Sequence, residues 1–162
     1  MEYIVERIQG HFGQLRSDLN GLTQTGSLPQ KQATIALKKM IRTIAQLFVE
    51  SDEPKAWVQL IMREQAKPTE AFDIIYEGQM KHVQRMLSTL IATCIGLSPE
   101  SDEVKIRCHA LVGQILIFTL SRESLLRHLN VKKLTTEHIE KIYSILIEHA
   151  ESCLVIKMSE RP

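Results

Sequence analysis

Residues 101–121, SDEVKIRCHALVGQILIFTLS, decide how the whole chain folds. A serine followed by two acids is typical of a helix start, because the serine caps the first turn and the helix dipole favours the acids. Beyond them, apolar side chains point in almost every direction around a helix, and the only polar seam is Arg107, Gln114 and Ser121. We expect one side of this helix to face the chain's own core and another to face a second copy.

The length and the charge balance of the chain limit the classes of function that it can have. The chain has 162 residues, enough for one domain, and 20 Lys and Arg balance 19 Asp and Glu. Without a basic excess, the chain is a poor candidate for direct contact with DNA. No signal peptide opens it, and polar residues interrupt the most apolar helix, so we expect a cytoplasmic protein with no membrane contact. We expect three buried, reduced thiols, Cys94, Cys108 and Cys153.

Apolar residues recur at spacings of three and four throughout, and no stretch alternates as a strand does, so the fold class is all-α. The predicted helices cover residues 2–22, 30–50, 54–66, 69–96, 102–121, 124–129 and 136–156. The apolar arc of the final helix spans roughly 200°, wider than the ~100° stripe that one core requires. This is the second helix with more apolar surface than one copy covers. On the 69–96 helix, the residues expected to face solvent are Glu77, Lys81, Gln84, Arg85 and Ser88.

The residues that carry chemistry do not assemble into a catalytic or metal site. The sequence lacks a glycine-rich phosphate loop and the motifs GxSxG and HExxH. Cys108 and His109 are neighbours on a helix and point about 100° apart, so they do not pair. His138 and His149 share a face without a third ligand. We expect no enzyme activity, no cofactor and no metal.

Two features leave alternatives open. His109 falls within the apolar surface of its helix, either as a core histidine or as a polar anchor in a ligand cavity beside Gly113. The cluster Arg63-Glu64-Gln65 is either part of a ligand site or a charge bridge at a helix end.

Two segments extend the interpretation. REQAKPTEA (63–71) and HALVGQILIF (109–118), in this order and at this separation, resemble the C-terminal domain of TetR-type transcriptional regulators, most closely the CecR-like subgroup. The resemblance covers residues 30–157. It implies a helical effector-binding and dimerisation domain, with no cofactor, that follows an N-terminal helix-turn-helix. That DNA-binding head is absent here, so we expect either a fragment or a protein that naturally lacks it.

The resemblance also implies positions for both sites. Helices matching 102–122 and 136–157 would form a four-helix bundle with the partner copy in a homodimer. The interface residues assigned to them are Ile115, Phe118, Ile139, Ile142, Tyr143, Leu146 and Ala150. The helix at residues 2–20 would link the cavity to the head. The ligand-binding residues assigned by position are Phe12, Trp57, Ile61, Arg63, Phe72, Tyr76, His109 and Gly113.

The function expected from these features is the ligand-sensing and dimerisation domain of a repressor. A small apolar or amphipathic effector would release DNA through the head. The alternative is a helical protein–protein interaction domain without a small-molecule ligand, which a filled core near His109 would favour.

Overall fold

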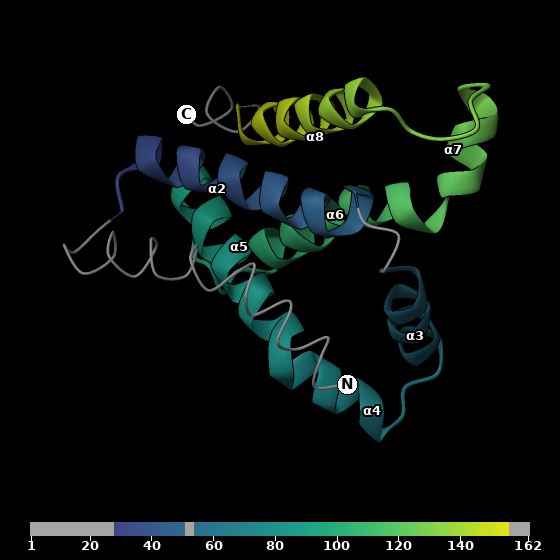
Figure 1. Cartoon of the computed structure of the whole chain (residues 1–162). Helices are drawn as coiled ribbons and strands as arrows, with labels where there is room; N and C mark the ends of the chain where they lie inside the picture. Colours follow the sequence, from purple (N-terminus) through teal and green to yellow (C-terminus); the bar gives the residue numbers. More distant parts are fainter. Residues whose placement is uncertain (1–27, 51–53, 156–162) are drawn as a thin grey trace.

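The structure is a computed structural model that describes residues 28–50 and 54–155 (Figure 1). Helices follow one another throughout these ranges, and no strand occurs within them, which confirms the all-α prediction. The elements are α2 (Gln30–Ala45), the π-helix η1 (Gln46–Glu50), α3 (Pro54–Ala66), α4 (Glu70–Ile75), the π-helix η2 (Tyr76–Met80), α5 (Lys81–Ile95), α6 (Asp102–Leu120), α7 (Arg122–His128) and α8 (Thr136–Val155). The predicted helix at residues 2–22 lies outside the described residues.

Four long helices enclose the core. α8 runs beside α2, α5 crosses α2, and α6 packs on α5, whereas α3 and α4 lie on the side of the molecule away from α8 (Figure 1). The apolar side chains that recur every three or four residues on these helices meet in one cluster. Its most deeply buried large side chains are Leu37, Met40, Ile41, Leu87, Leu90, Ile115, Tyr143 and Leu146.

Cations on α2 attach it to α8. Arg42 pairs with Glu140 at 2.7 Å, and its guanidinium carbon lies 4.6 Å from the centre of the Tyr143 ring. Lys38, one helical turn from Arg42 on α2, pairs with Glu151 of α8. Because these pairs are partly exposed, each contributes on the order of 1 kcal/mol or less, and the apolar contact between the helices remains the main source of stability.

The helix boundaries follow local sequence signals. Ser101 accepts a hydrogen bond from the backbone N–H of Val104 at 3.4 Å and caps α6, as the sequence predicts. α5 ends at Gly96, whose φ of 66° suits a residue without a side chain. Among the described residues, no single helix is long and apolar enough to cross a membrane. α6 and α7 pass that test of length and composition only as a pair bent by 71°.

Two helical stretches widen into π-helices, which the sequence pattern does not predict. η1 ends the long helix that begins with α2, and side chains from the end of α6 and the start of α7 bind its carbonyls. The Thr119 hydroxyl donates to the carbonyl of Phe48 at 2.6 Å, and the Arg122 guanidinium donates to that of Val49 at 2.9 Å. The end of α6 is therefore bonded to the end of α2. η2 separates α4 from α5 and begins at Tyr76, where the candidate site lies.

Candidate functional site

A polar cavity of about 680 Å³ lies between α5 and α6. This volume falls within the range of roughly 300–1,000 Å³ that is typical of small-molecule sites. Residues from η2 and α5, from the turn before α6, and from α6 itself form its wall. They are Tyr76, Lys81, Gln84, Arg85, Ser88, Thr89, Pro99, Glu100, Lys105, Cys108 and His109.

Helical spacing explains why these residues share one hollow. On α5 the lining residues fall at intervals of three and four, and so do the three on α6, so each set occupies one helix face. The two faces meet where the Cys108 thiol donates to the carbonyl of Gln84 at 3.6 Å. Cys108 is buried there, and burial raises the pKa of its thiol, partly offset by a hydrogen bond with the Ser88 side chain.

This arrangement corrects one expectation. The polar face of the 69–96 helix was expected to face solvent, yet Ser88 is buried and Gln84 is half-buried against α6. The correction has a physical reason: a polar side chain can line a cavity as readily as an outer surface, and hydropathy does not distinguish the two. The sequence analysis therefore missed most of the α5 residues at this cavity.

Cations outnumber acids at the cavity. Lys81 pairs with Glu77 at 2.6 Å, and Lys105 pairs with Glu100 at 3.0 Å. Arg85, a third cation, has no acidic partner among the described residues. The Glu100 carboxylate is 83% exposed, so its pair with Lys105 is a weak surface ion pair.

The structure brings three of the eight predicted ligand-binding residues together. The rings of Phe72 and Tyr76 stack with centroids 5.9 Å apart, and Tyr76 and His109 both line the cavity. His109 is exposed, so the alternative of a core histidine is wrong. Because apolar residues surround His109 on most sides of α6, the sequence pattern did not distinguish an exposed cavity position from a core position.

The other predicted ligand-binding residues lie elsewhere. Ile61 and Arg63 are on α3 and line neither hollow described here. Gly113 is exposed on α6, where an added Cβ would meet no heavy atom within 4 Å. Phe12 lies outside the described residues, and so does the side chain of Trp57, although α3 contains it. Their assignment to a ligand site remains a prediction.

The cluster at residues 63–65 forms a bridge at a helix end, one of its two proposed roles. Glu64, near the end of α3, is buried and accepts hydrogen bonds from the Thr69 hydroxyl at 2.6 Å and the Thr69 backbone N–H at 3.2 Å. Thr69 in turn caps α4. The Thr69 hydroxyl bond lowers the pKa of Glu64, burial opposes this, and Arg63 at 3.2 Å lowers it further. Glu64 thus joins α3 to α4.

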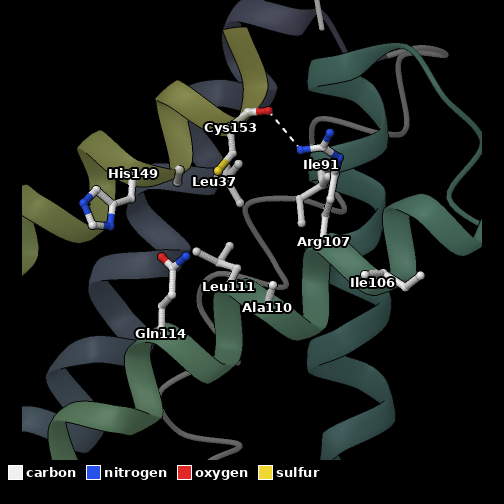
Figure 2. A pocket seen from close by; sticks show the side chains of 10 residues that line it. Leu37, Ile91, Ile106, Arg107, Ala110, Leu111, Gln114, His149 and Cys153 are labelled. Carbon is white, nitrogen blue, oxygen red and sulfur yellow. Dashed lines mark hydrogen bonds between the residues drawn. The ribbon is translucent and has the colours of Figure 1, made fainter. Parts of the chain in front are cut away.

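A second, apolar hollow of about 180 Å³ lies on the other flank of α6 (Figure 2). α6 and α8 form its sides, and Leu37 of α2 and Ile91 of α5 also line it. Arg107 spans it by donating to the carbonyl of Cys153 at 3.0 Å. The Gln114 side-chain oxygen is buried there without a hydrogen-bond partner, which is a costly state for an amide oxygen. We call this hollow the α6–α8 groove.

The predicted interface residues lie mainly within the single chain. Five are buried in its own core: Ile115, Ile142, Tyr143, Leu146 and Ala150. Phe118 and Ile139 are half-buried against the same core. A side chain that is less than a tenth exposed has little surface left for a second copy.

A different set of apolar side chains remains exposed beside the α6–α8 groove. Ile106 and Ile117 are 68% and 50% exposed on α6, and Ile145 is 44% exposed on α8. Ala110 and Gly113 lie between the two α6 isoleucines on the same helical face. On α8, His149 and Cys153 continue the line of Ile145 at intervals of four, and both line the groove. We call these seven residues the apolar face. Cys153 is exposed, which corrects the expectation of three buried thiols.

The described residues hold no group of three or more histidine, cysteine or acidic side chains placed to bind a metal ion.

Comparison with known proteins assigns the family. Residues 33–155 match the family model of the C-terminal domain of the HTH-type transcriptional dual regulator CecR. This chain belongs to that family. The chain is also similar to the HTH-type transcriptional dual regulator CecR of Shigella flexneri, with 28% identity over 119 residues, which are 74% of this chain and 51% of the relative. The chain thus spans about half the length of the curated relative that it matches.

Membership in the CecR C-terminal family fixes the general class. The chain is a TetR-type C-terminal helical domain, and its family is one of transcriptional regulators rather than of enzymes. The resemblance found on residues 63–71 and 109–118 is confirmed, and both segments lie within the matched range.

Proposed function

We propose that this chain is the effector-binding and dimerisation domain of a TetR-type regulator, linked in the whole protein to a DNA-binding helix-turn-helix head. Membership in the CecR C-terminal family carries this proposal. The hollow beside His109 supports a sensor over a protein–protein interaction domain without a ligand, because it offers a small molecule a site between α5 and α6.

The mechanism is a shift between two arrangements of the domain. A small amphipathic effector in the α5–α6 cavity binds one arrangement more tightly than the other and so changes the spacing of the two heads on DNA. In the expected case the effector releases a repressor in the cytoplasm. The relative's name is that of a dual regulator, so activation at other promoters is an alternative outcome.

The apolar face is the surface that we propose for the second copy. Its exposed isoleucines lie on the two helices that carry more apolar residues than one core needs. A second copy there would cover the α6–α8 groove. This proposal keeps the predicted pair of helices and uses other residues on them, since five of the seven predicted residues are buried in the core.

Thermal unfolding with and without effectors tests the sensor. A panel of small apolar and amphipathic drugs and metabolites is screened against the wild-type chain, and a ligand at a hundred times its Kd should stabilise the fold by about 2.7 kcal/mol. Tyr76→Ala, in the cavity, should reduce the shift. Ile74→Ala, exposed on the neighbouring α4, is the matched control and should not. Absence of any shift across the panel would count against a sensor.

The nucleotide sequence upstream of the Met1 codon tests the link to a head. An in-frame helix-turn-helix there would support the regulator proposal. Its absence would favour a protein that acts on partners instead of operators.

A further inference from the structure

The polar cavity carries a net positive charge, which an apolar effector site would not. Its wall holds three cations, Lys81, Arg85 and Lys105, and one acid, Glu100. Adding Glu77, which pairs with Lys81, still leaves an excess of one positive charge. The unpaired cation is Arg85, and arginine presents a planar fork of donors that matches a carboxylate or sulfonate.

The charges on α6 are divided between its two flanks. Lys105 and His109 are on the cavity side. On the groove side, Arg107 pairs with Glu103 at 3.1 Å and donates to the carbonyl of Cys153. Glu103 is therefore directed toward Arg107, and neither it nor Asp102, the other acid in the first turn of α6, is among the residues that line the cavity. Since the exposed pair between Lys105 and Glu100 is weak, an incoming anion can replace Glu100 at low cost.

The same cavity also has an apolar part. Tyr76 stacks on Phe72 and presents an aromatic surface, and the floor is made by Cys108, a buried thiol that behaves as a small apolar group. Gln84 and Thr89 complete the wall with uncharged polar groups. A ligand that fits this wall needs one anionic end and an apolar body.

We propose that the α5–α6 cavity binds amphipathic organic anions, whose carboxylate or sulfonate pairs with Arg85 and Lys105 while the apolar body contacts Tyr76. This inference rests on the proposed sensor function and names its class of effector.

Two fluorescent probes of nearly the same shape test it. 8-Anilinonaphthalene-1-sulfonate carries an anionic group, and N-phenyl-1-naphthylamine has the same aromatic body without that group. The wild-type chain is titrated with each probe. Arg85→Gln should weaken binding of the sulfonate by about tenfold, because it removes the charged partner of the anion, and should change binding of the neutral probe by less than about twofold. Arg85→Gln with Lys105→Gln should weaken sulfonate binding further.

Three control variants locate the effect. Arg85→Lys, which keeps the charge but loses the planar fork of donors, should weaken sulfonate binding less than Arg85→Gln does. Arg127→Gln removes an exposed cation on α7, and Ile106→Ser alters the opposite flank of α6. Neither should change the affinity for the sulfonate.

The outcomes separate the two proposals. Sulfonate binding that does not change in Arg85→Gln, or that falls together with binding of the neutral probe, would overturn the anion inference alone. Failure of the wild-type chain to bind either probe would overturn the inference and count against the sensor function as well. Loss of sulfonate binding in Ile106→Ser would place the probe on the apolar face and also overturn the inference.

Discussion

The two flanks of α6 show how one helix can serve two surfaces. On the α5 flank, lysine, histidine and cysteine side chains line a polar cavity with excess positive charge. On the α8 flank, the groove is lined mainly by apolar side chains, and its one arginine is already paired. Both flanks are open to solvent in the single chain. Only the α8 flank is apolar enough that covering it with another protein surface would be favourable. This difference is the basis for proposing a ligand site on one flank and a contact between copies on the other.

The largest expected effect comes from placing a charge on the apolar face. Ile117→Asp should weaken the dimer by at least about 100-fold, because association would bury an unpaired carboxylate. Ile117 is half exposed in the single chain, so the fold should survive. Sedimentation equilibrium measures the dissociation constant, and circular dichroism checks the fold. Ile74→Asp, at a similarly exposed position on α4, is the matched control and should dimerise normally. A monomeric wild-type chain at high concentration would contradict the comparison of the two flanks.

The thiols sharpen the comparison next. Cys153 is exposed at the groove, whereas burial raises the pKa of both Cys94 and Cys108. Cys153 should react with Ellman's reagent about 100-fold faster than the other two, since the thiolate is the nucleophile and needs access. Dimerisation through the apolar face should slow Cys153, and Ile117→Asp should restore its rate. Equal rates for all three thiols would contradict this assignment.

A smaller effect tests the bond between the end of α6 and the end of α2. Thr119→Val keeps the side-chain shape and removes the hydroxyl that donates to the Phe48 carbonyl, which should cost about 1 kcal/mol of unfolding free energy. Urea unfolding measures the change. Thr93→Val, which removes a hydroxyl bonded within α5, is the matched control and should cost less. Equal costs would mean that the bond to η1 has no special role.

The smallest effect concerns the joint between α3 and α4, far from both flanks. The hydrogen bond from the Thr69 side chain, with help from Arg63, holds the folded pKa of Glu64 below its usual 4.5. Its stabilisation is therefore present above about pH 4.5 and is lost as the pH falls through the folded pKa. Glu64→Gln should lower the melting temperature near pH 7, and the gap should narrow near pH 3. Glu123→Gln, on an exposed pair, should show little gap at either pH.

The sequence predicted the fold more completely than the site. Apolar spacing found every described helix to within a few residues, because burial of one face per helix is a property of the pattern itself. The sequence did not identify Gln84 and Ser88 as cavity residues, because a polar residue on a cavity wall has the same pattern as one in solvent. Tyr143 and Leu146, which were predicted at the interface, illustrate the opposite difficulty. On a helix that is covered on two sides, apolar spacing does not show which side chains face the core and which face another chain. In the structure, Tyr143 and Leu146 are buried in the core.

The bonds that hold η1 have an asymmetry with a practical consequence. Thr119 and Arg122 supply specific side chains, but they bind main-chain carbonyls of Phe48 and Val49, which every amino acid possesses. These bonds therefore do not restrict which side chains are placed at Phe48 and Val49, as long as the π-helix η1 keeps its backbone conformation. Redesign of the α6 side must keep a hydroxyl and a guanidinium.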